Sequence, residues 1–256
     1  MRGHPIRSSS STALSHHRLR DASVAARIVA STGLAPPDLV FELGAGEGLL
    51  TEALRDHCRK IVAIEVDRGR WAELRSRFRN DPHVEAVLSD FLAFRFPDRA
   101  PYAVVSNVPF SLTAALMRRL QELPNPPRHA CLVLQTDAAM KWAGLGSDTQ
   151  ASVVLKVRFT IDVLLALRRA DFHPRPNVDC VLVRLARRDR PVFAAGEARA
   201  FEAFVRRGFN NRGRAAPGKA RSHPGELTFD DWVTAFRSAG HPPGASLSRR
   251  GGKGPG

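Results

Sequence analysis

The segment from Ser106 to Phe110, Ser-Asn-Val-Pro-Phe, carries groups that can hold a flat amine. The exocyclic amine of a nucleobase attacks poorly, because its lone pair is delocalised into the ring until acceptors hold its hydrogens. We expect the Asn107 side-chain oxygen and the Val108 carbonyl, fixed by Pro109, to be those acceptors. Phe110 would stack on the base, which contributes about 1–3 kcal/mol. The alternative is a turn after a buried strand, where Asn and Pro occur for backbone reasons.

A glycine-rich turn, Gly44-Ala45-Gly46-Glu47-Gly48, follows a predicted buried strand at 39–43. Glycines let a backbone approach a ligand closely, although the spacing differs from the dinucleotide fingerprint G-x-G-x-x-G. A second predicted strand at 61–64 ends at Glu65, about 20 residues on, where an acid can accept both hydroxyls of a ribose. The turn alone is weak evidence, and Glu65 is alternatively a solvated charge at a strand end.

Two further strands complete the pattern. Asp90 follows a strand at 84–88 and can accept from an adenine amine, although an Asp in this context is more often a helix N-cap. A fourth strand at 102–105 leads into Asn107. Candidate groups therefore follow four successive strands, at the carboxyl ends where ligands of open α/β sheets bind. The sequence predicts a Rossmann-like α/β sheet with its ligand at this edge.

The elements that must position these groups follow from apolar spacing. Val24, Ile28 and Val29 have helical spacing between Asp21 and Gly33, which predicts one amphipathic helix. Further predicted elements are helices at 71–78 and 112–120, a fifth strand at 130–134, one or two core segments at 151–159 and 161–167, and a strand at 181–183.

A proline-rich loop precedes this last strand and reads Phe172-His173-Pro174-Arg175-Pro176-Asn177-Val178. Two prolines predict a stiff, exposed loop, which would present Phe172 as a second aromatic platform. His173 is a candidate catalytic residue, a candidate phosphate contact, or a residue without a role.

Beyond Arg184 the pattern changes to short helices of a small second unit. Its predicted apolar faces are Phe201, Phe204 and Val205 on one helix, and Trp232, Val233 and Phe236 on another.

The positive charge is concentrated near the two ends. The 256 residues carry a formal net charge of +14, of which residues 1–27 contribute +4 and residues 186–256 contribute +8. Contacts of Arg and Lys with phosphates dominate nucleic-acid affinity, so a nucleic-acid partner is expected. An arginine-rich proteome explains why 34 of the 39 basic residues are Arg, but it does not explain their excess over acids.

Location and redox state follow from what the sequence contains. We expect a cytoplasmic protein with no membrane association, since no apolar run approaches the roughly 18 residues of a membrane span. The cysteines Cys58, Cys131 and Cys180 are far apart, which favours reduced, mostly buried thiols and gives no indication of a metal site.

In order and spacing, the motifs resemble those of the ribosomal RNA adenine N6-methyltransferases. The resemblance rests on Glu42 to Gly48, Glu65, Asp90, the segment 107–110 and the segment from Phe172 to Asp179, and it covers about residues 14–184. It is greatest to the Erm enzymes, which methylate an adenine in the peptidyl-transferase loop of 23S ribosomal RNA and confer macrolide, lincosamide and streptogramin B resistance. A Phe at 110, where the sibling small-subunit dimethyladenosine transferases usually have Tyr, and the short basic helical unit favour Erm.

The resemblance implies a class I methyltransferase sheet with S-adenosyl-L-methionine as cofactor and a small C-terminal helical domain. The catalytic positions that it implies are Asn107, Val108, Pro109, Phe110 and Phe172, with both aromatic rings stacking on a flipped base. The cofactor-binding positions that it implies are His17, Leu19, Glu42, Gly44, Ala45, Gly46, Glu65, Val66, Asp90, Phe91 and Asn107.

Four regions are expected on this basis. They are a flexible basic arm at 1–13, a catalytic domain at 14–184, a small basic helical RNA-binding domain at 185–248 and a disordered tail at 249–256. The expected partner is ribosomal RNA, with 23S favoured, and the expected state is a monomer without metal. Transfer would be direct, onto a base flipped out of its stack at a cost of a few kcal/mol.

One segment departs from the family pattern. Where the family usually has Ser-Gln-Asn-Phe-Leu, this chain has Ser15-His16-His17-Arg18-Leu19, so the Gln, Asn and Phe are all replaced. The segment closes over the cofactor in the family, and its contacts here are therefore in question. A small-subunit adenine dimethyltransferase, a DNA adenine methyltransferase and a catalytically silent RNA-binding relative stay open as alternatives.

Overall fold

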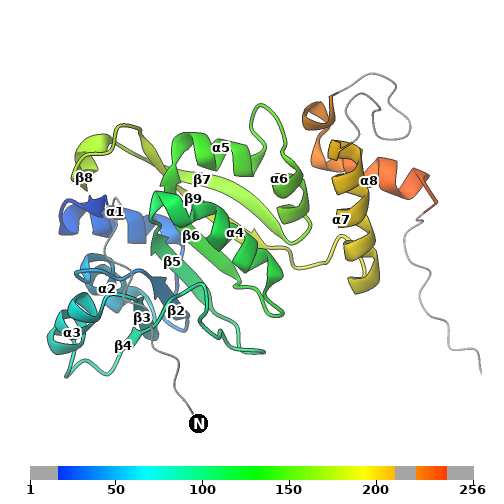
Figure 1. Cartoon of the computed structure of the whole chain (residues 1–256). Coiled ribbons are helices and arrows are strands. Elements are labelled where there is room, and N and C mark those ends of the chain that lie inside the picture. Colours follow the sequence, from blue (N-terminus) through cyan, green and yellow to red (C-terminus); the bar gives the residue numbers. More distant parts are fainter. Residues whose placement is uncertain (1–16, 211–222, 241–256) are drawn as a thin grey trace, which may run out of the picture. The chain divides into compact units, whose positions relative to one another are not determined.

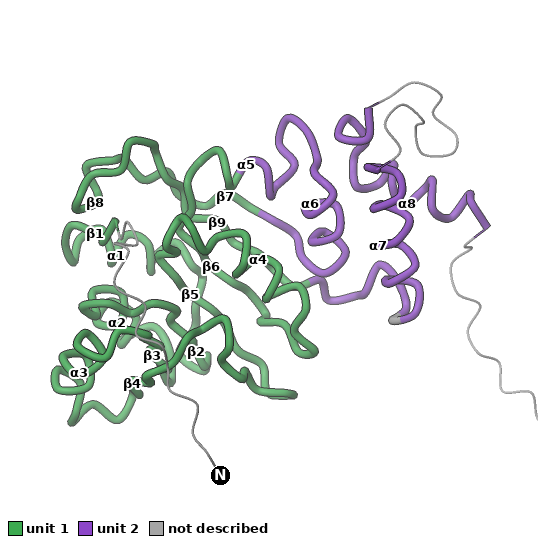
Figure 2. The backbone as a smooth tube through the Cα atoms, in the orientation of Figure 1, with its two compact units in different colours: residues 1–139, 162–187 green, residues 140–161, 188–256 purple. Residues whose placement is uncertain are grey.

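The computed structural model describes residues 17–210 and 223–240, so the predicted arm at 1–13 and tail at 249–256 lie outside the described residues. The chain forms two compact units (Figure 2). Unit 1 comprises residues 1–139 and 162–187, and unit 2 comprises residues 140–161 and 188–256. The catalytic domain expected at 14–184 includes residues 140–161. These residues group with the C-terminal helices instead, because Val153 and Val154 pack into the same apolar cluster as Phe201.

Unit 1 is built around a sheet in the order β4-β3-β2-β5-β6-β9-β7 (Figure 1). Neighbouring strands from β4 to β6 are parallel, and β9 runs antiparallel to β6. The strands are β2 (Leu39–Leu43), β3 (Lys60–Glu65), β4 (Val84–Leu88), β5 (Ala103–Asn107), β6 (His129–Gln135), β7 (Phe159–Leu167) and β9 (Cys180–Arg187). The Rossmann-like α/β class is confirmed, and the central strands are buried as their near-continuous apolar sequences predict.

The predicted helix between Asp21 and Gly33 is confirmed as α1 (Ala22–Thr32). It begins at Asp21, whose carboxylate accepts from the backbone N–H groups of Ser23 and Val24 at 3.1 Å. It ends at Gly33, which has a φ of 69°. The other helices of this unit are α2 (Leu49–Leu54), α3 (Arg68–Arg77), α4 (Thr113–Glu122) and α5 (Thr136–Ala143), which is shared with unit 2.

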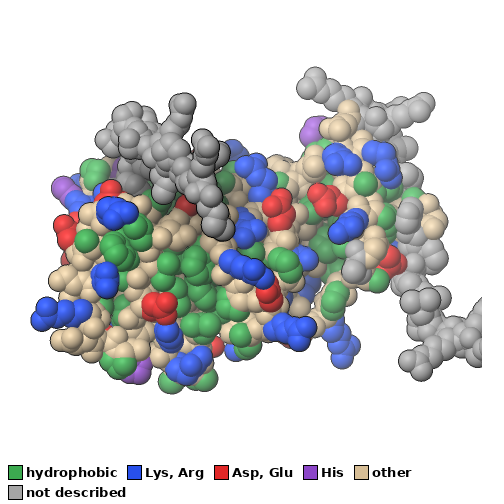
Figure 3. Space-filling model, turned by 60° about the horizontal axis from the view of Figure 1, so that its bottom comes forward, with side chains coloured by type: hydrophobic (Ala, Val, Ile, Leu, Met, Phe, Trp, Pro, Cys, Tyr) green, Lys and Arg blue, Asp and Glu red, His purple; other side chains and the backbone are tan. Residues whose placement is uncertain are grey.

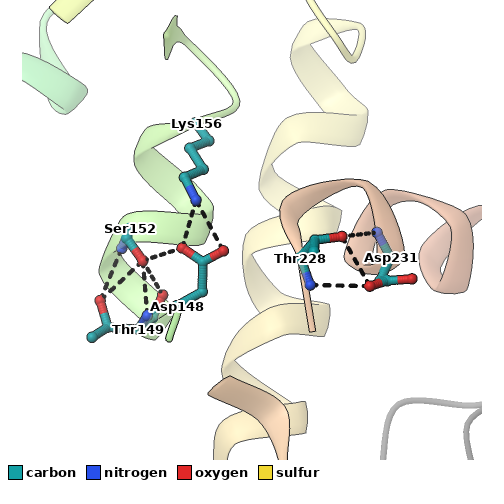
Figure 4. Close-up of polar contacts among 6 residues, drawn as sticks. All are labelled: Asp148, Thr149, Ser152, Lys156, Thr228 and Asp231. Atoms are coloured by element: carbon teal, nitrogen blue, oxygen red, sulfur yellow. Dashed lines mark hydrogen bonds and ion pairs between the residues drawn. The ribbon is translucent and has the colours of Figure 1, made fainter. Parts of the chain in front are cut away.

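Unit 2 contains α6 (Gln150–Leu155), α7 (Ala195–Asn210) and α8 (Phe229–Ser238). The predicted apolar faces of the last two helices are confirmed, since Phe201, Val205, Trp232 and Phe236 are buried in one cluster. Polar caps define where the short helices begin (Figure 4). Thr228 and Asp231 form a reciprocal capping box at α8.

A second polar network in unit 2 holds the segment before α6. The carboxylate of Asp148 accepts from Lys156 Nζ at 2.7 Å and from the Ser152 hydroxyl at 2.7 Å (Figure 4). The backbone N–H of Asp148 donates to the carbonyl of Gly225 at 2.8 Å. This network therefore ties the α5–α6 connection to the segment that precedes α8.

The basic excess predicted for the C-terminal region is not carried by its described helices. Residues 188–210 and 223–240 contain six Arg and six Asp or Glu. The segments 211–222 and 241–256, outside the described residues, contain four and three Lys or Arg and no acid. On the face drawn in Figure 3, Lys and Arg side chains likewise lie among Asp and Glu side chains.

The expected state of the cysteines is confirmed, because all three are free and buried. Within the described residues, no helix is long and apolar enough to cross a membrane.

Candidate active site

A pocket lies at the carboxyl ends of β2, β3 and β5, where the sequence predicted a ligand. It contains residues from all three strand ends, and a smaller space beside it shares Arg18, Gly44, Gly46 and Asn107. The lining residues of the pocket are His17, Arg18, Gly44, Gly46, Glu65, Val66, Arg70, Phe91, Asn107, Val108, Pro109, Phe110 and Leu112. The parallel register therefore brings together most of the predicted site residues.

The glycine turn presents bare backbone to this space. Gly44 and Gly46 have φ values of 72° and 56°, which L side chains rarely adopt. A Cβ added at either position would meet no atom within 4 Å, so the backbone faces open room. Gly48 also has a positive φ, of 81°, but an added Cβ there would lie 2.8 Å from Leu74 Cδ1, so this glycine faces packed side chains and not open room.

Glu65 is fixed by the turn that it faces. One carboxylate oxygen accepts from the N–H of Gly46 at 2.9 Å, and the other accepts from the N–H groups of Val66 and Asp67 at 2.9 Å. A carboxylate has about four acceptor positions, and three are used here. Glu65 thus both orders the glycine turn and keeps an acceptor position for a ligand hydroxyl.

Glu42 lies beneath the glycine turn, with only 1% of its surface exposed. Its carboxyl accepts a 2.5 Å hydrogen bond from the Thr51 hydroxyl. Burial raises the pKa of Glu42 to about 8, and the nearby charge of Glu65 acts in the same direction. Glu42 is therefore largely protonated at neutral pH and acts as a neutral floor to the site.

Asn107 is the last residue of β5, and its orientation is set from two sides. The preceding Ser106 donates its hydroxyl to the Leu43 carbonyl at 2.7 Å, which joins the ends of β5 and β2. Asn107 Nδ2 donates to the His17 carbonyl at 2.8 Å. The amide is thus turned with its nitrogen towards the N-terminal segment, which leaves the oxygen as its free acceptor.

His17 belongs to the segment that departs from the family pattern, and it lines the pocket. Its Nδ1 donates to the Pro174 carbonyl at 2.8 Å, and its ring lies 5.0 Å from the Phe110 ring, tilted by 34°. His17 thus contacts the segment 107–110 through Phe110 and the proline-rich loop through Pro174. The neighbouring Arg18 and Leu19 form the short strand β1 (Arg18–Leu19), which pairs with β8 (Phe172–His173) (Figure 2).

The prediction that Phe172 is an exposed aromatic platform is wrong. Phe172 is 2% exposed and packs in the main apolar cluster with Leu19 and Leu167. Residues of a strand alternate between faces, so β8 turns Phe172 inward and the exposed His173 outward. The two prolines begin only at Pro174, after this strand, so they do not lift Phe172 from the core.

Of the other predicted cofactor positions, all but Asp90 line the pocket or the smaller space beside it. Val66 is 63% exposed and, with the buried Phe91, lines the pocket. Ala45 and Leu19 line the smaller space beside it. Asp90 is exposed and does not line either space. Its carboxylate accepts from the N–H of Leu92 at 2.9 Å, in a local turn.

Several residues at the site were not singled out from sequence. Arg18 lines both spaces and forms an ion pair with Glu47 of the glycine turn. Arg70 lines the pocket from the first turn of α3. The replacement of an aromatic residue by arginine at position 18 was the available signal for a new charged contact.

A separate cavity lies outside this region. It has a volume of about 910 Å³ and lies among α2, α3 and the loop after α3. Its walls are charged surface residues such as Arg55, Arg77 and Asp81, which pair with neighbouring acids or bases. It contains none of the predicted site residues.

A seven-stranded sheet in this order, parallel from β4 to β6 and antiparallel at β9, with a glycine turn after β2 and an acid at the end of β3, is typical of the Rossmann-like methyltransferase class. A model of the family described as ribosomal RNA adenine dimethylase matches residues 7–221. The chain belongs to this family of rRNA adenine N6-methyltransferases.

The chain is 32% identical over 251 residues to an rRNA adenine N-6-methyltransferase of Streptomyces fradiae, covering 88% of this chain and 77% of that protein. It is 29% identical over 221 residues to ribosomal RNA small subunit methyltransferase A of Geobacter metallireducens, covering 83% and 80%. Among solved structures, it is similar to the 23S rRNA methyltransferase ErmE, with a TM-score of 0.77 and 28% identity, covering 86% and 98%.

Proposed function

We propose that this protein transfers a methyl group from S-adenosyl-L-methionine to N6 of an adenine in the peptidyl-transferase loop of 23S ribosomal RNA. The modification would confer resistance to macrolides, lincosamides and streptogramin B. The observation that carries the proposal is the orientation of Asn107, whose oxygen is left as an acceptor at the mouth of a pocket shared with Glu65.

The residues of the pocket fit the proposed cofactor. Gly44 and Gly46 leave open room where a Cβ would otherwise stand. Glu65 keeps an acceptor position for a ribose hydroxyl, and the exposed Val66 offers an apolar surface for a flat adenine ring. When bound, the cofactor would supply an electrophilic methyl group on a sulfonium.

The other side of the pocket fits a target adenine. Phe110 lies next to Asn107 and offers a ring for stacking. Asn107 and the Val108 carbonyl would hold the two hydrogens of the amine and direct its lone pair towards the methyl group. The methyl group would pass from the sulfonium to the amine held by these residues, and the amine would then lose one proton to water. Orientation of donor and acceptor would account for most of the rate.

The likeness to ErmE and to the Streptomyces fradiae enzyme favours the large-subunit substrate. The likeness to the small-subunit enzyme of Geobacter metallireducens supports 16S ribosomal RNA as the second candidate. Methyl transfer from labelled cofactor to purified 23S and 16S ribosomal RNA separates the two. Label in a peptidyl-transferase adenine of 23S is expected, and label only in 16S would overturn the proposal.

A further inference from the structure

A basic groove lies beside the candidate active site and is lined by both residues of β1. It has a volume of about 460 Å³, and it shares Arg18, Leu19, Glu47 and Leu49 with the space that reaches Asn107. We call it the β1–β8 groove and define it by its lining residues: Arg18, Leu19, Arg20, Glu47, Leu49, Ala170, Phe172, His173 and Arg175.

The charges of this groove favour an anion. Three arginines and His173 line it, against the single carboxylate of Glu47. Pairing of β1 with β8 sets Arg18 directly opposite His173, and both residues line the groove. Arg20 is partly neutralised, since it pairs with Asp21 at 2.7 Å and donates to the Ala170 carbonyl.

Arg175 is the cation most available to a ligand. It is exposed, and within the described residues it forms no ion pair. Backbone pairing and Pro174 and Pro176 on either side of Arg175 hold this loop in place. Leu19, Leu49, Ala170 and Phe172 are the apolar residues of its lining. A lining that combines arginines with apolar residues fits a phosphodiester and its sugar.

Arg18 is held by a partner that an anion can replace. Its ion pair with Glu47 joins side chains that are 43% and 51% exposed, and exposed pairs of this kind are weak. A phosphate in the groove would compete with Glu47 for the Arg18 guanidinium, and Arg–phosphate contacts are among the stronger charge-assisted hydrogen bonds.

We propose that the β1–β8 groove binds the phosphodiester backbone of the RNA strand beside the target adenosine, with Arg18 and Arg175 as phosphate contacts and Glu47 as the competing anion. This inference rests on the proposed function, because it assigns the path by which the same RNA enters the same site.

The test is binding of the full-length chain to a transcript of the peptidyl-transferase region of 23S ribosomal RNA, measured over a series of salt concentrations. Arg175→Ala is expected to weaken binding about three- to ten-fold. It should also reduce the salt slope, the slope of log affinity against log salt concentration, by about one, which corresponds to one lost phosphate contact. Glu47→Gln is expected to strengthen binding about two- to five-fold, because Arg18 loses its competitor. Net charge alone would give the same two signs, so the assignment rests on comparison with a charge-matched substitution outside the groove.

Arg79→Ala is the matched control. Arg79 is an exposed arginine of the same unit and lines the separate 910 Å³ cavity. Arg79→Ala removes the same charge as Arg175→Ala, and its RNA binding is expected to stay near that of the wild type. Equal losses in Arg79→Ala and Arg175→Ala, or weaker binding by Glu47→Gln, would overturn the assignment.

Two further measurements complete the design. Calorimetry of S-adenosyl-L-methionine binding is expected to give unchanged affinity in Arg175→Ala, whereas a loss there with an unchanged RNA salt slope would assign the groove to the cofactor. Methylation of the transcript by the wild-type chain tests the proposed function separately. If the wild type methylates 23S but Arg175→Ala binds normally, the groove assignment fails and the proposed function stands.

Discussion

Asn107 Nδ2 donates a 2.8 Å hydrogen bond to the main-chain carbonyl of His17. The bond joins the end of β5 to the N-terminal segment that departs from the family pattern. Because only the nitrogen of the amide can donate, the bond decides which end of the side chain is left for a ligand. A residue that lies 90 positions earlier in the chain therefore orients the side-chain oxygen of Asn107 in the candidate active site.

Removal of the Asn107 side chain should separate binding from chemistry. In Asn107→Ala we expect S-adenosyl-L-methionine affinity to stay largely intact while methyl transfer falls by orders of magnitude, because the lost acceptor acts on the amine during reaction. Single-turnover transfer to 23S ribosomal RNA measures the rate, and calorimetry measures cofactor affinity. Unchanged turnover would remove Asn107 from its proposed role.

His17 should act on the rate through Asn107 and Phe110. In His17→Ala the N-terminal segment loses its hydrogen bond to Pro174 and its ring contact with Phe110, so we expect kcat to fall about ten-fold with little change in Tm. His17→Asn can still donate to the Pro174 carbonyl and should recover part of the loss. Equal kcat in wild type and His17→Ala would contradict this role.

Glu42 should make stability depend on pH. Its pKa is raised from 4.5 to about 8 in the folded protein, so unfolding releases a proton between these values. The contribution of Glu42 to the free energy of unfolding is fully present below pH 4.5 and is lost as the pH rises through 8. The loss amounts to several kcal/mol, because each unit of pKa difference corresponds to about 1.36 kcal/mol. Glu42→Gln should not show this loss.

Urea unfolding of wild type and Glu42→Gln at pH 5, 6.5 and 8 measures this effect. The free energy of unfolding of the wild type should decline relative to that of the variant as the pH rises. Parallel pH profiles would show that Glu42 is ionised in the folded protein.

The two phenylalanines should respond differently to truncation. Phe172 is buried in the core, so Phe172→Ala should lower stability by about 3–5 kcal/mol and lower the Tm. Phe110 is only partly buried, so Phe110→Ala should instead cost about 1–3 kcal/mol of base stacking and raise the KM for RNA. Thermal melts beside kinetics compare them, and a fully stable Phe172→Ala would return that residue to the candidate platforms.

The basic residues of 211–222 and 241–256 should contribute to RNA affinity. Replacing their seven Lys and Arg by Gln should weaken RNA binding and flatten its dependence on salt, because fewer counterions are released on binding. The described helices of unit 2 stay intact in this variant, and calorimetry of cofactor binding is the control. An unchanged salt slope would show that these charges do not face the RNA.

Much of the site could be predicted because it depends on local sequence. The strands, the glycine turn and the groups after them follow from apolar runs and from turn residues whose positions the parallel register aligns. The burial of Phe172 could not be predicted, because it depends on pairing of β8 with Arg18 and Leu19, more than 150 positions earlier.

The same limit applies to His17, Arg18 and residues 140–161. The Pro174 carbonyl and Glu47, to which the first two bind, are distant in sequence. Residues 140–161 have an apolar pattern that fits either unit, and only packing of Val153 against the C-terminal helices decides between them. Long-range contacts therefore account for most of the differences from expectation.

The most direct test of the central claim is to map the methylated nucleotide in ribosomal RNA from cells that express the chain, with cells that express Asn107→Ala as the control. Mass spectrometry of RNA fragments should find N6-methylated adenine in the peptidyl-transferase loop of 23S with the wild type only. Methylation confined to 16S, or no difference between wild type and Asn107→Ala, would contradict the account.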